Sequence, residues 1–146
     1  MFGRKKPDVL VVGAGPVDLV AALRLAQHDI DVAIVDKEWR PAAHSYGLAL
    51  HPRSLQLLEE LGVLDNVLDR AYLIRKVGLY DGAERRAGIQ LTETDDPTTF
   101  VAVLRQDVLE SVLERALRDR GVRVLWNHQA SDLTMLEDHV NVTIER

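Results

Sequence analysis

The chain has 146 residues, about the size of one ordinary domain, and its 47% hydrophobic and 28% charged residues are a globular balance. A net charge of −5 argues against a nucleic-acid partner, which needs a basic excess. There is no cysteine, which excludes disulfides and cysteine nucleophiles and is compatible with a cytoplasmic location. The scattered histidines indicate no metal site, and no apolar run approaches the roughly 20 residues of a transmembrane segment.

The first third of the chain predicts a βαβ unit. Asp8–Val12 is rich in β-branched residues and predicts a strand buried on both faces. Pro16 suits the first turn of a helix, and apolar residues at helical spacing continue through Gln27. Asp31–Asp36 predicts a second strand. Two strands joined by a helix should pair in parallel.

Two further helices are predicted downstream. One opens at Pro52 and ends at Gly62, and a short helical turn is expected around residues 65–71. The other covers Gln106–Arg120 and ends at Gly121. The apolar positions of both helices are core candidates: Leu55, Leu57, Leu58, Leu61, Val108, Leu109, Val112, Leu113, Ala116 and Leu117.

Most of the remaining sequence predicts β-strands. Leu73–Tyr80 and Arg86–Leu91 flank a turn at residues 81–84 and predict an antiparallel hairpin. Residues 92–99 predict a polar loop. Strands are expected at Val122–Trp126 and His139–Glu145, joined by a polar segment around residues 131–138. The fold class is therefore α/β: a Rossmann-like βαβ unit with a small parallel sheet of about three strands plus an antiparallel hairpin. Dinucleotide-binding sheets usually have five or six parallel strands, so the predicted sheet is incomplete by comparison.

The pattern Gly13-x-Gly15-x-x-Asp18 lies between the first strand and the first helix. In a dinucleotide site the first Gly permits the tight turn, and the second lets the backbone of Gly13-Ala14-Gly15-Pro16 approach a pyrophosphate held by the helix N-terminus. Asp36, 23 residues after Gly13, ends the second strand, where a carboxylate accepts hydrogen bonds from a ribose. The alternative is an ordinary βαβ turn with a solvated Asp.

Three stretches resemble the N-terminal part of the FAD-dependent class A flavoprotein monooxygenases, the family of para-hydroxybenzoate hydroxylase and phenol hydroxylase: VVGAGPVDLVAALRLA, VAIVDKEWRPAAHSYGLALHPRSLQLLEELGVLDNVL and VLRQDVLESVLERALRDRGVRVLW. Together they cover nearly the whole chain. By this resemblance Asp36 corresponds to the acidic ribose ligand, Lys37 stands where an Arg is common, and Arg105 corresponds to an arginine along the ribityl and pyrophosphate part of the flavin.

The resemblance implies an oxidoreductase. In the complete enzymes NAD(P)H reduces bound FAD, reduced flavin and dioxygen give a flavin hydroperoxide, and this species hydroxylates a small aromatic substrate. The catalytic residues and the aromatic substrate cannot be assigned from this sequence, and NADH is not distinguished from NADPH.

Three positions depart from the family pattern. Asp18 replaces the third Gly of the fingerprint, so its side chain should push the helix away or turn toward solvent. Its charge would also repel a phosphate by about 3 kcal/mol at roughly 6 Å, unless it simply favours the first turn of the helix. Asp29 stands where a left-handed Gly usually ends the helix, a conformation that Asp tolerates. Tyr46 stands where many members carry an Arg near the flavin.

Motifs that complete the family's FAD site are not found in residues 1–146, which therefore read as a partial N-terminal FAD-binding domain without the substrate domain. A complementing C-terminal chain or a second copy is the expected partner. Two alternatives stay open: a degenerate module or truncated product that no longer binds nucleotide, and half of an NAD-dependent dehydrogenase.

Other polar and aromatic residues have local explanations. His44 and His51 read as loop histidines, although a hydrogen bond to a cofactor is an alternative. Ser45 and Ser54 lack triad partners. Solvated roles are expected for the pairs Asp95-Asp96 and Arg85-Arg86, and packing roles for Trp39 and Trp126, with an adenine pocket as the alternative for Trp39.

Overall fold

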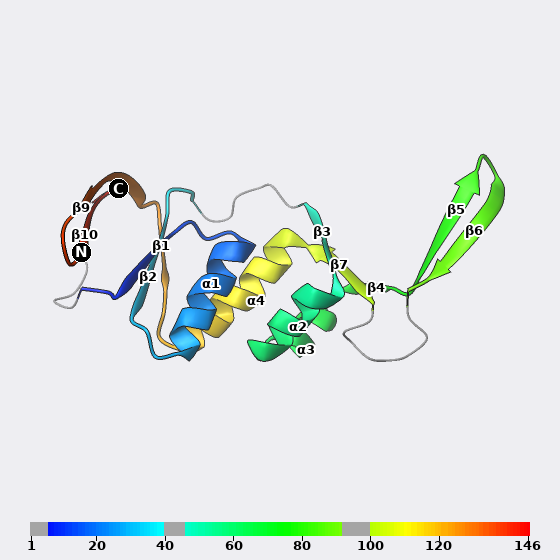
Figure 1. Ribbon diagram of the computed structural model, residues 1–146, viewed down its shortest axis with the longest axis horizontal. Helices are drawn as coiled ribbons and strands as arrows, with labels where there is room; N and C mark the ends of the chain where they lie inside the picture. Colours follow the sequence, from blue (N-terminus) through cyan, green and yellow to red (C-terminus); the bar gives the residue numbers. More distant parts are fainter. Residues whose placement is uncertain (1–5, 40–45, 92–99) are drawn as a thin grey trace. The chain divides into compact units, whose positions relative to one another are not determined.

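The computed structural model describes residues 6–39, 46–91 and 100–146 (Figure 1). Its contacts divide the chain into two compact units, of which the first combines Met1–His44 with Glu110–Arg146 and the second is Ser45–Leu109. No helix of the described part of the chain is long and apolar enough to cross a membrane. The candidate nucleotide loop belongs to the first unit, and Arg105 to the second.

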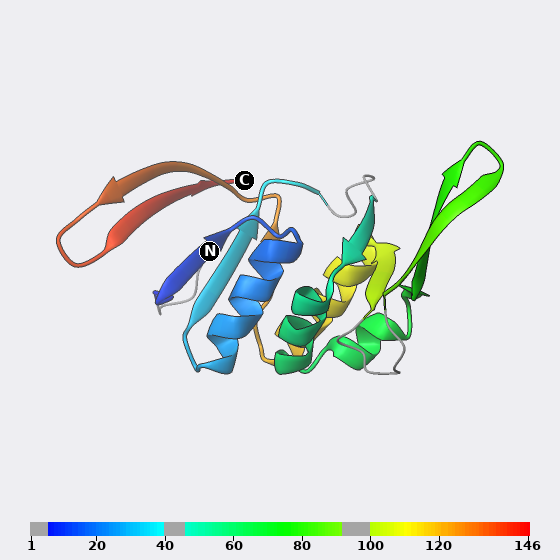
Figure 2. The ribbon, with the colours of Figure 1, turned by 45° about the vertical axis from the view of Figure 1, so that its right-hand side comes forward.

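The first unit contains the predicted βαβ arrangement. Strands β1 (Val9–Val12), β2 (Val32–Asp36) and β8 (Val124–Trp126) form a parallel sheet in the order β1-β2-β8. Helix α1 (Pro16–Gln27) connects β1 to β2 and lies along one face of this pair (Figures 1 and 2). The small parallel sheet of three strands is therefore confirmed.

Burial in this sheet differs from strand to strand. β2 lies in the middle, and Ile34 and Val35 are fully buried. β1 is an edge strand, half-buried along Val9–Val11, and Val12 is 57% exposed. The expectation that Asp8–Val12 is buried on both faces is wrong because β1 has a strand neighbour on only one side among the described strands.

The end of α1 confirms the expectation for Asp29. Its φ is 59°, so it adopts the left-handed conformation in which glycine usually ends a helix. Ile30 then donates its N–H to the carbonyl of Leu25 at 3.2 Å. An Asp side chain is accepted here because the position is exposed.

The C-terminal segment is a hairpin. β9 (Gln129–Met135) pairs antiparallel with β10 (Val140–Glu145). The polar connection expected around residues 131–138 is therefore largely strand, and the expectation is wrong. β9 is almost entirely exposed, and Leu133 and Met135 are its only large apolar residues, so the strand pattern in the sequence was weak.

The second unit is built around an antiparallel sheet in the order β3-β7-β4. Its strands are β3 (Gly47–Leu50), β4 (Tyr72–Ile74) and β7 (Val101–Arg105). β7 was not predicted from the sequence. β7 is the central strand, and Ala102 and Leu104 are buried.

Helices α2 (Pro52–Glu60) and α3 (Leu64–Leu68) confirm the predicted helical segments. Gly62 between them has φ 71°, which explains why α2 ends there. The buried residues of this segment are Leu55, Leu58, Leu61, Val63, Leu64 and Val67.

The predicted hairpin is present as β5 (Lys76–Asp81) and β6 (Glu84–Gln90). Its first strand starts later than expected, because residues 72–74 pair with β7 as β4. Every residue of both hairpin strands is exposed. The expected loop at residues 92–99 lies outside the described residues.

Helix α4 (Gln106–Asp119) follows β7 directly and confirms the third predicted helix. It begins in the second unit, and its residues from Glu110 onward belong to the first. Its buried apolar residues are Leu109, Val112, Leu113 and Leu117. Gly121, with φ 80°, ends the helix as predicted.

Candidate functional site

The loop between β1 and α1 makes a tight turn. Gly13 has φ 117°, a conformation that side chains rarely adopt, which confirms the reason for a glycine there. Its N–H donates to the carbonyl of Val35 at 2.8 Å, which continues the pairing of β1 with β2. The loop therefore leaves the sheet at the carboxyl ends of its parallel strands, where open α/β sheets bind ligands.

Asp36 contacts this loop directly. Its Oδ2 accepts the N–H of Ala14 at 2.7 Å, a contact between residues 22 apart in sequence. Its Oδ1 accepts the N–H of Glu38, also at 2.7 Å, and its backbone carbonyl accepts the N–H of His128 at 2.8 Å. The carboxylate is half-buried and lies at the loop instead of pointing away from it.

Asp18 does not behave as its sequence position suggested. Its Oδ2 accepts the N–H of Gly15 at 3.1 Å, so a first-turn carboxylate binds the N-cap amide of its own helix. A Cβ at residue 13 would lie 2.6 Å from this oxygen. The side chain is half-buried in the turn, so the expectation that it turns toward solvent is wrong, and the first-turn alternative describes it better. The expected displacement of the helix stays a prediction.

The other two predicted residues of this region flank the turn. Pro16 is the first residue of α1, and Leu19 donates to the carbonyl of Gly15 at 3.0 Å as the helical hydrogen bonds begin. Proline has no N–H, so the first-turn donors outside the helical ladder are those of Val17 and Asp18. Lys37 follows β2 and is exposed.

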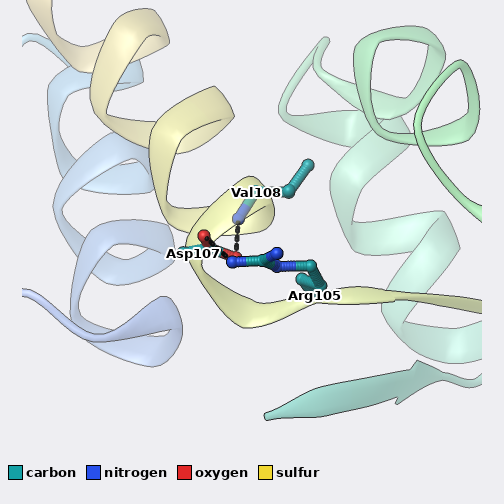
Figure 3. Close-up of polar contacts among 3 residues, drawn as sticks. All are labelled: Arg105, Asp107 and Val108. Atoms are coloured by element: carbon teal, nitrogen blue, oxygen red, sulfur yellow. Dashed lines mark hydrogen bonds and ion pairs between the residues drawn. The ribbon is translucent and has the colours of Figure 1, made fainter. Parts of the chain in front are cut away.

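Arg105 ends β7 in the second unit (Figure 3). Its Nη2 donates to Asp107 Oδ2 at 2.8 Å and its Nε to Oδ1 at 3.0 Å, a bidentate pair within two residues. Hydrogen bonding to Asp107, together with the charge of Asp107, raises the pKa of the guanidinium above its ordinary value. The side chain is 67% exposed, so the pair leaves part of the cation open to solvent.

Several secondary candidates are on the surface. Tyr46 is 66% exposed, and Trp39 is 71% exposed, so its expected packing role is wrong. Trp126 is half-buried, in line with packing. His51 is the exposed N-cap residue of α2, and Ser54 lies in the first turn of that helix.

Arg86, from one of the two charged pairs considered above, lies at the exposed edge of the β5–β6 hairpin. Arg86 forms exposed ion pairs with Asp81 and Glu84, as expected for a solvated hairpin edge. His44, Ser45 and the pair Asp95-Asp96 lie outside the described residues, so their interpretations stay predictions.

The sequence did not reveal the segment after β8. Asn127 has φ 58° and donates to the carbonyl of Glu38 at 3.0 Å, and His128 donates to the carbonyl of Asp36. These bonds tie the end of β8 to the residues that follow β2. An Asn in a short polar stretch after a strand was the available signal, since Asn tolerates the left-handed conformation.

The parallel sheet, the glycine turn and the carboxylate at the end of β2 define a Rossmann-like βαβ protein of the nucleotide-binding type. A family model described as an FAD binding domain matches residues 6–146. The chain therefore belongs to this FAD-binding family, that of the FAD-dependent class A monooxygenases. This assignment favours flavin over the nicotinamide alternative.

Individual relatives agree with the family. The chain is 31% identical to 6-methylpretetramide 4-monooxygenase of Streptomyces rimosus over 96% of its own length and 26% of that protein. It is 30% identical to a rifampicin monooxygenase of Rhodococcus hoagii over 86% of its length and 27% of that protein. The crystal structure of p-nitrophenol 4-monooxygenase from Pseudomonas putida superposes with a TM-score of 0.83 at 26% identity, over 92% of this chain and 35% of the other. The chain thus spans about a quarter to a third of the length of these relatives.

Proposed function

We propose that residues 1–146 are an N-terminal FAD-binding domain, partial relative to the family, that binds the ADP half of FAD at the turn after β1. The contact that supports this most strongly is the 2.7 Å hydrogen bond from Ala14 N–H to Asp36 Oδ2. It brings the candidate phosphate loop and the candidate sugar acceptor together from separate strands. In the proposed roles Gly13, Ala14, Gly15 and Pro16 approach the pyrophosphate, and Asp36 accepts from the adenosine ribose.

The residues of the turn fit a pyrophosphate, provided that the Asp18 side chain leaves the space it occupies. Gly13 and Gly15 bring no side chain of their own, and the Asp18 carboxylate is the neighbouring group that lies against them. The first turn of α1 supplies N–H donors and the positive end of its dipole. The Asp18 carboxylate lies in the same turn and must leave it for a phosphate to take the amide of Gly15.

Charged residues outside the turn have supporting roles in this proposal. Lys37 is exposed beside Asp36, and we assign it to the adenosine side. Arg105 presents an exposed guanidinium whose orientation Asp107 fixes, and we assign it to the ribityl and pyrophosphate part of the flavin.

Bound FAD supplies redox chemistry that, in the longer enzymes, uses NAD(P)H as electron donor and adds an oxygen atom to an aromatic substrate. We propose the same activity, an aromatic hydroxylation, for a longer protein or complex that contains this chain. The chain's own residues bind and orient the dinucleotide in that enzyme. Support comes from relatives whose names describe monooxygenases acting on 6-methylpretetramide and on p-nitrophenol.

A complementing C-terminal chain or a second copy stays the predicted partner. Two features of the first unit support it: the edge strand β1, and large exposed apolar side chains on the β9–β10 hairpin, among them Leu133 and Met135. A cytoplasmic location also stays a prediction. Light scattering of the purified chain, alone and with a separately expressed C-terminal part of a relative, tests the partner.

The proposed function is tested by titrating the purified chain with FAD and following flavin fluorescence and heat. We expect saturable binding with one site, and at least about tenfold weaker binding for Asp36→Ala, because a charge-assisted acceptor at the sugar is lost. Arg86→Ala is the matched control, since its ion pairs are exposed and belong to the hairpin. Absence of FAD binding by both the natural chain and Asp18→Gly would contradict the proposal and favour the degenerate-module alternative.

A further inference from the structure

The N-terminus of α1 already holds an anion, and this anion is part of the chain. Asp18 Oδ2 accepts the N–H of Gly15 at 3.1 Å. The same oxygen lies 2.6 Å, and the Cγ 3.0 Å, from the position that a Cβ on Gly13 would take. The carboxylate therefore lies against the open side of Gly13, in the space that the absent side chain leaves free.

A second carboxylate occupies the neighbouring amide. Asp36 Oδ2 accepts the N–H of Ala14, and the N–H of Gly13 belongs to the strand pairing with Val35. All three consecutive amides of the turn are thus hydrogen-bonded within the chain. Of these acceptors only Asp18 is attached to the helix next to the turn, and rotation about its own short side chain is enough to remove it.

We propose that Asp18 is an internal occupant of the phosphate position: its carboxylate binds the Gly15 amide in the ligand-free chain and must rotate out before the pyrophosphate of an adenine dinucleotide can bind. The inference rests on the proposed FAD binding and deepens it. Asp18 is then a specificity-determining residue that lowers the affinity for every ligand carrying a phosphate at this turn.

Two effects set the size of the penalty. The bond from the Gly15 amide to a charged acceptor is lost when Asp18 rotates, and the rotated carboxylate still lies within several ångströms of the incoming phosphate. A unit charge about 6 Å from another, at an effective dielectric of about 20, changes an equilibrium constant by about a hundredfold. Salt and solvent reduce this, so a gain of about ten- to a hundredfold in affinity is expected when the carboxylate is removed.

Two variants of Asp18 separate the effect of its negative charge from the effect of its side chain occupying the phosphate position. Asp18→Asn keeps the size of the side chain and an oxygen that can accept from Gly15, and we expect it to bind FAD about tenfold more tightly than the natural chain. Asp18→Gly removes both charge and side chain and should bind up to about a hundredfold more tightly. Asp29→Asn is the control: it removes one charge at the other end of α1, tolerates the left-handed conformation, and should leave the Kd within twofold.

The ligand-free protein provides a second readout. The Gly15 amide of the natural chain should exchange its proton with solvent more slowly than in Asp18→Gly, because the hydrogen bond to Asp18 protects it. Equal Gly15 exchange rates in the two proteins would overturn internal occupancy. Internal occupancy would also be overturned if Asp18→Asn and Asp18→Gly bound FAD no more tightly than the natural chain. The proposed FAD binding would not be affected by that result. If neither the natural chain nor any of these variants binds FAD, the proposed function fails and this inference fails with it.

Discussion

The turn after β1 and the surface around Arg105 satisfy their charged groups in different ways. Asp36 reaches an amide 22 residues away, from a strand whose core residues are fully buried. Arg105 and Arg86 instead pair with carboxylates two to five residues away, on side chains that are largely exposed. Contacts between sequence-distant residues hold a fixed geometry, whereas local exposed pairs contribute little to it. We therefore expect the turn after β1 to be the more rigid of the two regions.

The largest expected loss of stability comes from a substitution in β2, the middle strand of the parallel sheet. Ile34→Ala should lower the free energy of unfolding by about 2–5 kcal/mol, because Ile34 is fully buried and truncation leaves a cavity. Leu79→Ala, at a half-exposed position in β5, should cost less than about 1 kcal/mol. Urea denaturation followed by circular dichroism measures both. Equal losses would contradict a core centred on β2.

The next largest loss of stability is expected for Asp36, whose partner Ala14 is distant in sequence, compared with Asp107, whose partner Arg105 is close. Asp36→Ala should lower the free energy of unfolding by about 1.5–3 kcal/mol, because the N–H groups of Ala14 and Glu38 lose a charged acceptor. Asp107→Ala removes the half-exposed partner of Arg105 and an acceptor for the N–H of Val108, and should cost about 1 kcal/mol. The same denaturation experiment tests the pair, and a larger loss for Asp107→Ala would reverse the comparison.

A smaller effect is expected at the end of α1. Asp29 has φ 59°, so Asp29→Gly should raise the free energy of unfolding by about 0.5 kcal/mol and Asp29→Ala should lower it by about 1 kcal/mol. The opposite signs are the test, and thermal melts of the two variants measure them. A stabilising Ala would mean that the left-handed conformation is not kept.

The smallest effect is expected in the hairpin. Arg86→Ala breaks exposed ion pairs with Asp81 at 3.1 Å and Glu84 at 3.2 Å, and should change the free energy of unfolding by less than about 0.5 kcal/mol. FAD affinity should stay within twofold of the natural chain. A loss of binding would place part of the site in the second unit's hairpin.

The sequence predicted best where residues have strong local preferences. Pro16, Gly62 and Gly121 marked helix ends correctly, and apolar spacing placed the three long helices. It failed for two strands. β9 is exposed and mostly polar, and its pairing with β10, the other half of the hairpin, makes it a strand. β7 was overlooked although it pairs with β3 on one side and β4 on the other, both far from it in sequence.

The direction of the Asp18 side chain at the candidate site was also missed, although its partner is local. The sequence identified the departure from the glycine pattern and the charge it brings. The direction of the side chain depended on a competition between solvation and a hydrogen bond to the N-cap amide, which spacing alone does not decide. The hydrogen bond between Ala14 and Asp36 likewise follows from the pairing of β1 with β2, which brings the two strand ends together.

The most direct measurement is an amide-resolved NMR titration of the chain with FAD. We expect chemical shift changes to concentrate at Ala14, Gly15 and the backbone after Asp36, while the signals of the hairpin glycines Gly82 and Gly88 stay unchanged. Changes that concentrate on the hairpin, or saturable FAD binding that leaves Ala14 and Gly15 unmoved, would contradict the claim that the turn after β1 holds the dinucleotide.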